Sequence, residues 1–244
     1  MEVKDKDKKK FGSKGGKKEA AGEGMKEERR LSEEEVFRRV LEAVRSGRED
    51  KEAFEELRRI NRERKGEDKR RAERLGEELI NECKRIIFVF SEKMVNLERI
   101  VKLVLEGADV NLQDNFYGRT ALIQAVWNDV QEKIVKMLIK AGADVNVQDN
   151  KGWTALMWAA DGNQKGVLNL LIENGANLFL KNNEGKTAMD LAGDEKTKSF
   201  LKGLVDNMDE GVKKRMEREA ELRFGLKECN KEKAKGLILE LLGS

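Results

Sequence analysis

The sequence predicts an all-α protein, a solenoid of stacked helix pairs with projecting β-turns, flanked by charged helices. Two different sequence phrases recur with one common period, and apolar residues form helical stripes between them. In addition, the 244-residue chain contains no proline, whereas average usage of about 5% predicts roughly a dozen. A proline-free chain favours helices over a disordered, proline-rich scaffold.

The first recurring phrase is Gly-Ala-Asp-Val-Asn, with an altered last copy, Gly-Ala-Asn-Leu. Its copies begin at Gly107, Gly142 and Gly175, at spacings of 35 and 33 residues. The second phrase is Gly-x-Thr-Ala followed by Leu or Met, and its copies begin at Gly118, Gly152 and Gly185, at spacings of 34 and 33 residues. Two interleaved phrases that keep one period over three copies indicate a repeat architecture.

Each unit is interpreted as a helix, a loop, a second helix and a projecting turn. The threonine stands where the first helix begins and can cap it with its hydroxyl, and the glycine of each Gly-Ala-Asp phrase suits the left-handed position past a helix end. Asp149 to Gly152 has Asp first and Gly fourth, as a type I turn prefers. A lone helix pair cannot bury the apolar stripe of the second helices, which predicts stacking. The stripe comprises Ile100, Leu103 and Val104, then Val135, Leu138 and Ile139, then Leu168, Leu171 and Ile172.

Residues 94–205, a little under half of the chain, resemble about three ankyrin repeats. The family phrase Thr-Pro-Leu-His appears here as Thr-Ala-Leu-Ile, Thr-Ala-Leu-Met and Thr-Ala-Met-Asp. Alanine is a good helix former, so we expect the loss of the proline to be mild. The missing histidine removes a hydrogen bond that the family uses to join the threonine to its neighbours. The last copy, with polar Asp190, resembles the terminal capping repeat of the family, whose outer face must be compatible with water.

Residues 1–30 are predicted to form a disordered tail rich in lysine and glycine. Eight lysines lie between Lys4 and Lys18, with few apolar residues among them, so the segment cannot offset its ordering entropy. Such a tail is suited to RNA, DNA or an acidic membrane surface through counterion release. The alternative is a tail that only raises solubility.

Residues 31–93 are predicted to form a charged helical region, either a degenerate repeat that caps the stack or a separate domain. Ser32 with Glu35 three positions later matches a capping box, and Gly47 ends this helix. A second amphipathic stretch begins near Phe54, whereas residues 61–78 are almost entirely charged and predict a solvated helix or linker.

The repeat stack is assigned to residues 94–206, and C-terminal helices are assigned to residues 207–244. An apolar patch near the end of the chain is predicted to pack back on the stack, with a docking or dimerising helix as the alternative. The patch comprises Leu237, Ile238, Leu241 and Leu242.

The composition excludes most catalytic and metal-binding chemistry. Without histidine, the chain lacks the usual general base near neutral pH and imidazole metal ligands. Cys83 and Cys229 are far apart in the sequence and are expected to be reduced thiols of an intracellular, cytoplasmic protein. No phosphate-binding glycine loop and no nucleophile elbow occurs. We therefore expect a non-enzymatic protein with no cofactor, no catalytic residue and no metal site.

Charge and hydropathy bear on whether the partner is a nucleic acid or a membrane. Lys+Arg 50 against Asp+Glu 47 gives a net charge of only +3, so net charge alone does not argue for nucleic acid. The N-terminus lacks the apolar run of a secretory signal, and no segment offers about 18 uncharged apolar residues. We expect a monomer that does not insert into membranes.

The resemblance to ankyrin repeats implies a partner protein, bound by the projecting turns and the exposed face of the first helices. Carried over position by position, the candidate contacts are Asn115, Phe116, Tyr117, Arg119, Trp127, Asn128, Lys151, Trp153, Asp161, Glu184 and Lys186. Aromatic residues on turns and helix faces are typical binding hot spots, which favours Phe116, Tyr117 and Trp127. Trp153 fits a contact and the core equally well, and Trp158 is assigned to the core.

Two other functions stay open at this point. One is tethering to nucleic acid or an anionic surface through the Lys4–Lys18 tail. The other is a structural or designed repeat protein with no specific partner, which the absence of proline and histidine keeps open.

Overall fold

The computed structural model describes residues 30–85, 97–129 and 132–227, and every regular element in these ranges is a helix. The helices are α1 (Glu33–Ser46), α2 (Lys51–Glu67), α3 (Lys69–Arg85), α4 (Leu97–Leu105), α5 (Ala121–Trp127), α6 (Glu132–Lys140), α7 (Ala155–Asp161), α8 (Lys165–Glu173), α9 (Glu195–Asp206) and α10 (Glu210–Lys227). The lysine-rich tail and the apolar patch at Leu237–Leu242 lie outside the described residues.

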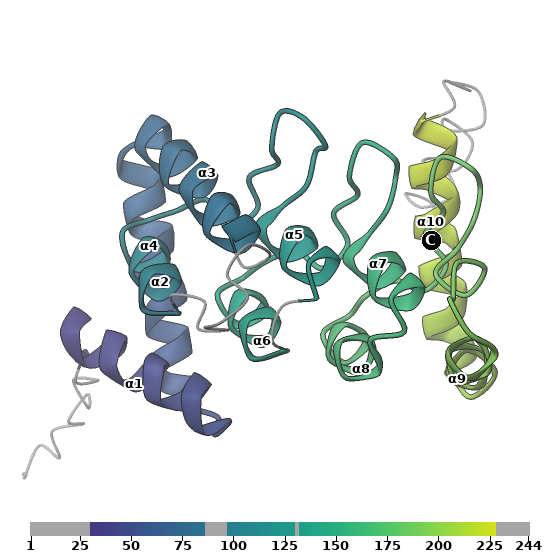
Figure 1. The fold of residues 1–244 in the computed structure, drawn as a ribbon, viewed down its shortest axis with the longest axis horizontal. Coiled ribbons are helices and arrows are strands. Elements are labelled where there is room, and N and C mark those ends of the chain that lie inside the picture. Colours follow the sequence, from purple (N-terminus) through teal and green to yellow (C-terminus); the bar gives the residue numbers. More distant parts are fainter. Residues whose placement is uncertain (1–29, 86–96, 130–131, 228–244) are drawn as a thin grey trace, which may run out of the picture. The chain divides into compact units, whose positions relative to one another are not determined.

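Helices α3 to α8 form three consecutive pairs whose first helices lie side by side (Figure 1). Helix α3 packs on α5 and α5 packs on α7, while each of the three pairs with the helix that follows it, α4, α6 or α8. Long loops precede α5 and α7 and extend past the row of first helices (Figure 1). The predicted all-α solenoid of stacked helix pairs with projecting turns is thereby confirmed.

The helix boundaries follow the residues that predicted them. The hydroxyl of Thr120 accepts the Ile123 N–H at 3.2 Å, and Thr154 caps α7 in the same way. The glycine that follows α4 is left-handed, with φ of +97° at Gly107, as are the glycines after α6 and α8, at +102° and +86°. Because L-residues with a Cβ are strained there, glycine ends these second helices.

Helices α1 and α2 share the hydrophobic core of the repeats. Their buried side chains, such as Val40 and Leu57, belong to the same cluster as Leu103 and Leu138. Helix α1 contacts α4 and α6, and α2 contacts α3 and α4. Ser32 caps α1 and Gly47 ends it with φ of +74°, as predicted. The domain boundary near residue 93 stays a prediction.

The segment 61–78 is not merely a solvated helix or linker. It spans the end of α2 and most of α3, and it buries Asn61, Ala72 and Leu75. The Asn61 side-chain amide donates to the Val104 and Ala108 carbonyls at 2.6 and 2.9 Å, where α4 ends. Within 61–78 the buried positions are few, so the surrounding charges hid the first part of an apolar face that α3 continues beyond residue 78.

The last copy of the repeat also differs from the prediction. The chain makes only a turn after Thr187, where the pattern predicts a helix, and α9 follows directly. Asp190 bonds back to Thr187, accepting its N–H at 2.9 Å and its hydroxyl at 2.7 Å. The Asp190 carboxylate therefore bonds the backbone N–H of Thr187, which would otherwise lack a partner at the start of this turn. Beyond the turn, the Gly193 N–H donates to the Ala160 carbonyl of α7.

A chain of asparagines fixes the register between repeats. The side-chain amide of Asn111 donates to the Gly142 carbonyl at 3.3 Å, and the amide of Asn146 donates to the Gly175 carbonyl at 3.0 Å. The third copy has Phe179 at the equivalent position, so this series of asparagines ends with Asn146. Asn177 stands where the earlier copies have aspartate, and its side-chain amide donates to the Met216 carbonyl in α10 at 2.9 Å. The last copy of the phrase is therefore bonded to helix α10 rather than to a further repeat.

An ion pair at the start of α2 gives the first testable prediction. The Arg39 guanidinium donates to both carboxylate oxygens of Asp50 at 2.7 Å, and Asp50 also caps α2 by accepting the Ala53 N–H. The hydrogen bonds from Arg39 hold the pKa of Asp50 below its usual range. We expect Asp50→Asn to lower the free energy of unfolding at neutral pH by about 1 kcal/mol.

The pH dependence of this effect has a defined sign. A carboxylate whose pKa is lowered by folding contributes stability above its unfolded pKa, and that contribution is lost as the pH falls through the folded pKa. The difference between wild type and Asp50→Asn should therefore be constant from about pH 7 to about pH 4.5 and shrink below about pH 4. Urea unfolding followed by circular dichroism measures it. The exposed Glu55→Gln variant on the same helix is the control, and a difference that grows in acid would contradict the assignment.

Candidate functional site

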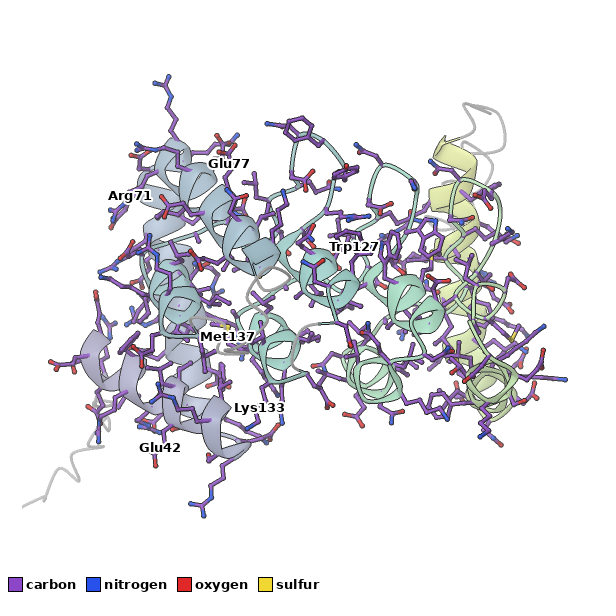
Figure 2. All side chains as sticks on the ribbon, in the orientation of Figure 1. Glu42, Arg71, Glu77, Trp127, Lys133 and Met137 are labelled. Carbon is purple, nitrogen blue, oxygen red and sulfur yellow. The ribbon has the colours of Figure 1, made fainter. Side chains whose placement is uncertain are left out.

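Three large apolar side chains are exposed among the described residues. The exposed fractions are 83% for Phe116, 56% for Tyr117 and 45% for Trp127. Phe116 and Tyr117 stand on the turn before α5, and Trp127 is the last residue of α5. We refer to these three residues as the aromatic surface. Figure 2 labels Trp127 between α5 and α7, where its ring meets that of Trp158 with centroids 6.4 Å apart.

Asp114 holds the turn that carries two of these aromatics. One of its oxygens accepts the N–H groups of Phe116 and Tyr117 at 3.0 and 2.6 Å, and its own carbonyl accepts the Gly118 N–H. Burial opposes the charge on Asp114, but the Tyr117 N–H and the ammonium of Lys84 outweigh it, so the pKa of Asp114 lies below its usual range. The turn is therefore fixed by an ionised side chain rather than by apolar packing.

Successive turns are joined by backbone hydrogen bonds. The Asn150 N–H donates to the Tyr117 carbonyl at 2.9 Å, and the Asn183 N–H donates to the Lys151 carbonyl at 3.0 Å. The side-chain amide of Asn150 adds a bond to the Phe116 carbonyl at 3.1 Å. We refer to these bonds between consecutive turns as the turn ladder. The turn ladder fixes the backbone of the turn that carries Phe116 and Tyr117.

The guanidinium of Arg119 lies behind the aromatic surface, and only 6% of this residue is exposed. Its central carbon is 4.2 Å from the ring centroid of Trp127, 4.9 Å from that of Trp158 and 5.0 Å from that of Tyr117. These distances are within the range of cation–π attraction, which is strongest over tryptophan. One cation therefore orders two rings of the aromatic surface.

Asp149 completes this cluster from the next turn. One of its oxygens accepts the N–H groups of Lys151 and Trp153 at 2.9 and 2.8 Å, and the other accepts the indole N–H of Trp158 at 3.2 Å. The second oxygen lies 3.8 Å from Nε of Arg119. The rings of Trp153 and Trp158 stack with centroids 4.2 Å apart. The cluster thus joins the turns of two repeats through charge and ring contacts.

Comparison with known proteins assigns the family. The family model for ankyrin repeats, in three copies, matches residues 88–182 and 124–215, together more than half of the chain. The chain belongs to the ankyrin-repeat family. No curated protein shows significant sequence similarity to it.

Many solved structures match the chain. One is the crystal structure of the ankyrin repeat domain of Bcl-3, described as a unique member of the IkappaB protein family. It is 32% identical over 43% of this chain, with a TM-score of 0.42. The present chain spans 46% of that chain.

The ankyrin turns and helices place the predicted contact residues in three different environments. Asn128 and Trp153 are half-buried, and the Asn128 amide donates to the Cys83 carbonyl at the end of α3. Arg119 is buried, although the prediction placed it with the exposed contacts. The remaining polar candidates are exposed, namely Asn115, Lys151, Asp161, Glu184 and Lys186.

The exposed ankyrin candidates do not all gather at one point. Asn115 adjoins Phe116 on its turn, whereas Glu184 and Lys186 stand on the last turn and pair with each other at 2.9 Å. The sequence singled out Asp149 only as the start of a type I turn and missed that it is a buried partner of Arg119 and Trp158. Its recurrence as Asp114, Asp149 and Asn182 before each turn is the signal that was available.

The described ankyrin repeats offer little for other chemistry. Among the residues that the structure places, no group of three or more His, Cys, Asp or Glu side chains could hold a metal ion. The same residues include no helix long and apolar enough to cross a membrane. Cys83 is a free, buried thiol, and burial raises its pKa to about 12. Cys229 lies outside the described residues.

Proposed function

We propose that the chain is a non-enzymatic interaction module that binds a partner protein through the aromatic surface of Phe116, Tyr117 and Trp127. Ankyrin repeats are generally protein–protein interaction modules. The observation that carries the proposal is the exposure of these three aromatics, two of which lie against the same guanidinium, while the other large apolar side chains of the described ranges are buried or half-buried.

The support beneath the aromatic surface strengthens the proposal. Arg119 holds two of the rings, and the turn ladder fixes the backbone that carries the third. Rings that are already ordered lose little conformational entropy on binding, which is why aromatic anchors dominate the energy of many interfaces. The remaining exposed candidates, including Lys151 and Asp161, would form a polar rim around these anchors.

The test is capture of proteins from nuclease-treated lysate by the full chain at moderate salt. We expect the triple variant Phe116→Ala, Tyr117→Ala, Trp127→Ala to lose the captured protein, since hot-spot truncations typically cost about 2 kcal/mol or more each. The matched control changes three exposed residues on the outer face of α8, as Lys165→Ala, Asn169→Ala and Glu173→Ala. All proteins must first show equal folding by circular dichroism.

The outcomes separate the proposal from its alternatives. Loss of capture in the aromatic triple variant and retention in the α8 variant support it. Equal capture by both variants would remove the aromatic surface as the site. Capture that depends on residues 1–30 and falls steeply with salt would favour tethering through the tail, which stays a prediction.

A further inference from the structure

One guanidinium nitrogen of the buried Arg119, Nε, is enclosed without a hydrogen-bond partner. Its guanidinium donates to no residue of the described ranges, and its one ion contact, from Nε to Asp149, is 3.8 Å long. Burying an N–H donor of a charged group without an acceptor is costly. Buried polar groups are nearly always bonded, so this exception requires an explanation.

Asp149 does not meet that need, because its Oδ2 lies 3.8 Å from Nε of Arg119, beyond hydrogen-bond distance. Its two carboxylate oxygens instead accept two backbone N–H groups and the indole N–H of Trp158. Asp149 therefore balances the charge of Arg119 without accepting a hydrogen bond from it. The donors of Arg119 remain available to an acceptor from outside the chain.

The surroundings of Arg119 leave a route to these donors. Only Nε of its nitrogens is enclosed without a partner, so the two terminal nitrogens remain within reach of solvent. The rings of Tyr117, Trp127 and Trp158 lie around the guanidinium carbon at 4.2 to 5.0 Å. Two of these rings belong to the exposed aromatic surface, so an acceptor that reaches Arg119 is flanked by apolar walls that exclude water.

We propose that Arg119 is the recognition residue for an Asp or Glu side chain of the partner protein, whose neighbouring apolar residue packs on Phe116 and Tyr117. This inference rests on the proposed function and names the chemistry that the partner must present. A carboxylate matches the forked donors of a guanidinium, and the bond strengthens where water is excluded.

The nearby charges favour a single carboxylate over phosphate. Asp149 and Asp114 both lie close enough to Arg119 to act on its charge. A dianionic phosphate or a run of nucleic-acid phosphates would be repelled by these two carboxylates. A monoanionic side chain on an otherwise apolar peptide meets less repulsion and uses the aromatic rings as well.

The experiment selects ligands from a display library of random short peptides on the full chain. We expect the enriched peptides to carry Asp or Glu beside an aliphatic or aromatic residue. Changing that acid to its amide should weaken binding to the wild-type chain about ten- to a hundredfold, the range for hydrogen bonds to charged groups. The same peptide change should have little effect on the Arg119→Gln variant, because the partner of the carboxylate is then absent.

The controls make each outcome decisive. Arg119→Lys keeps the positive charge but lacks the paired N–H donors of a guanidinium. It should therefore restore only part of the affinity that Arg119→Gln loses. Should Arg119→Gln fail to fold, the acid-to-amide peptide pair on the wild-type chain decides alone. Enriched peptides without acids that still need Phe116 and Tyr117 would overturn this inference and leave the proposed function standing.

Two further results would contradict more than the proposed recognition of a carboxylate. Peptides that bind the triple aromatic variant as well as wild type, or no enrichment at all, would overturn both proposals. Binding of single-stranded oligo-uridine that is lost in Arg119→Gln would reassign the site to phosphate.

Discussion

Replacing Gly152 with alanine is expected to lower the free energy of unfolding by about 2–4 kcal/mol, whereas Gly185→Ala should cost only about 1 kcal/mol. Both glycines occupy the same place in consecutive turns, with φ of +78° and +77°. A Cβ at Gly152 would lie 2.7 Å from the backbone nitrogen of Asn183 and 3.0 Å from the Cα of Asn182, but a Cβ at Gly185 meets nothing within 4 Å.

The pair separates two causes that usually occur together. The backbone strain of a left-handed residue is common to both variants, so the difference between them measures the close approach of the neighbouring turn. Urea unfolding followed by circular dichroism gives the two values. Equal losses would contradict the ladder as the reason for glycine at residue 152 and leave strain alone.

Asp149→Ala is expected to destabilise the chain by about 3–5 kcal/mol, because it removes one of the two carboxylates that balance the buried charge of Arg119. It also removes the acceptor of two backbone N–H groups and of the Trp158 indole. Unfolding in urea, followed by tryptophan fluorescence, measures both the loss and the changed environment of Trp158.

The next turn supplies the matched variant, Asp149→Asn. Asn182 stands at the equivalent position and accepts the N–H groups of Glu184 and Lys186 through its side-chain oxygen at 3.0 and 2.9 Å. An asparagine at 149 should therefore keep the turn and lose only the charge opposite Arg119, at a smaller cost than alanine. Identical losses for the two variants would show that charge alone matters at this position.

The repeat architecture was predictable because single residues determine it locally. Thr120 and Thr154 cap helices, and Gly107 ends one with a conformation that other residues avoid. These effects act within a few residues, so a sequence phrase records them directly. The structure and the family match confirm the fold that these phrases predict.

The missed features depend on contacts between distant residues. Helix α3 has an apolar face that includes Leu75, Leu79 and Ile80, but the sequence does not show that this face packs on α5. Arg119 looks like an exposed contact in the sequence because arginines usually are exposed. Only the turn of the next repeat, with Asp149, and the rings of Trp127 and Trp158 show why it is buried. The contact residues themselves stay predictions until a ligand is measured.

The bond from Asn177 to α10 also determines how long the repeat array can be. An array that simply stopped would leave the apolar face and the backbone of its last repeat open to another molecule. Here the Met216 carbonyl accepts the Asn177 amide, Arg223 of α10 donates to the Asn146 carbonyl, and Ala220 is buried. Helix α10 therefore terminates the series, and any additional repeat would have to be inserted ahead of Asn177 rather than appended after it.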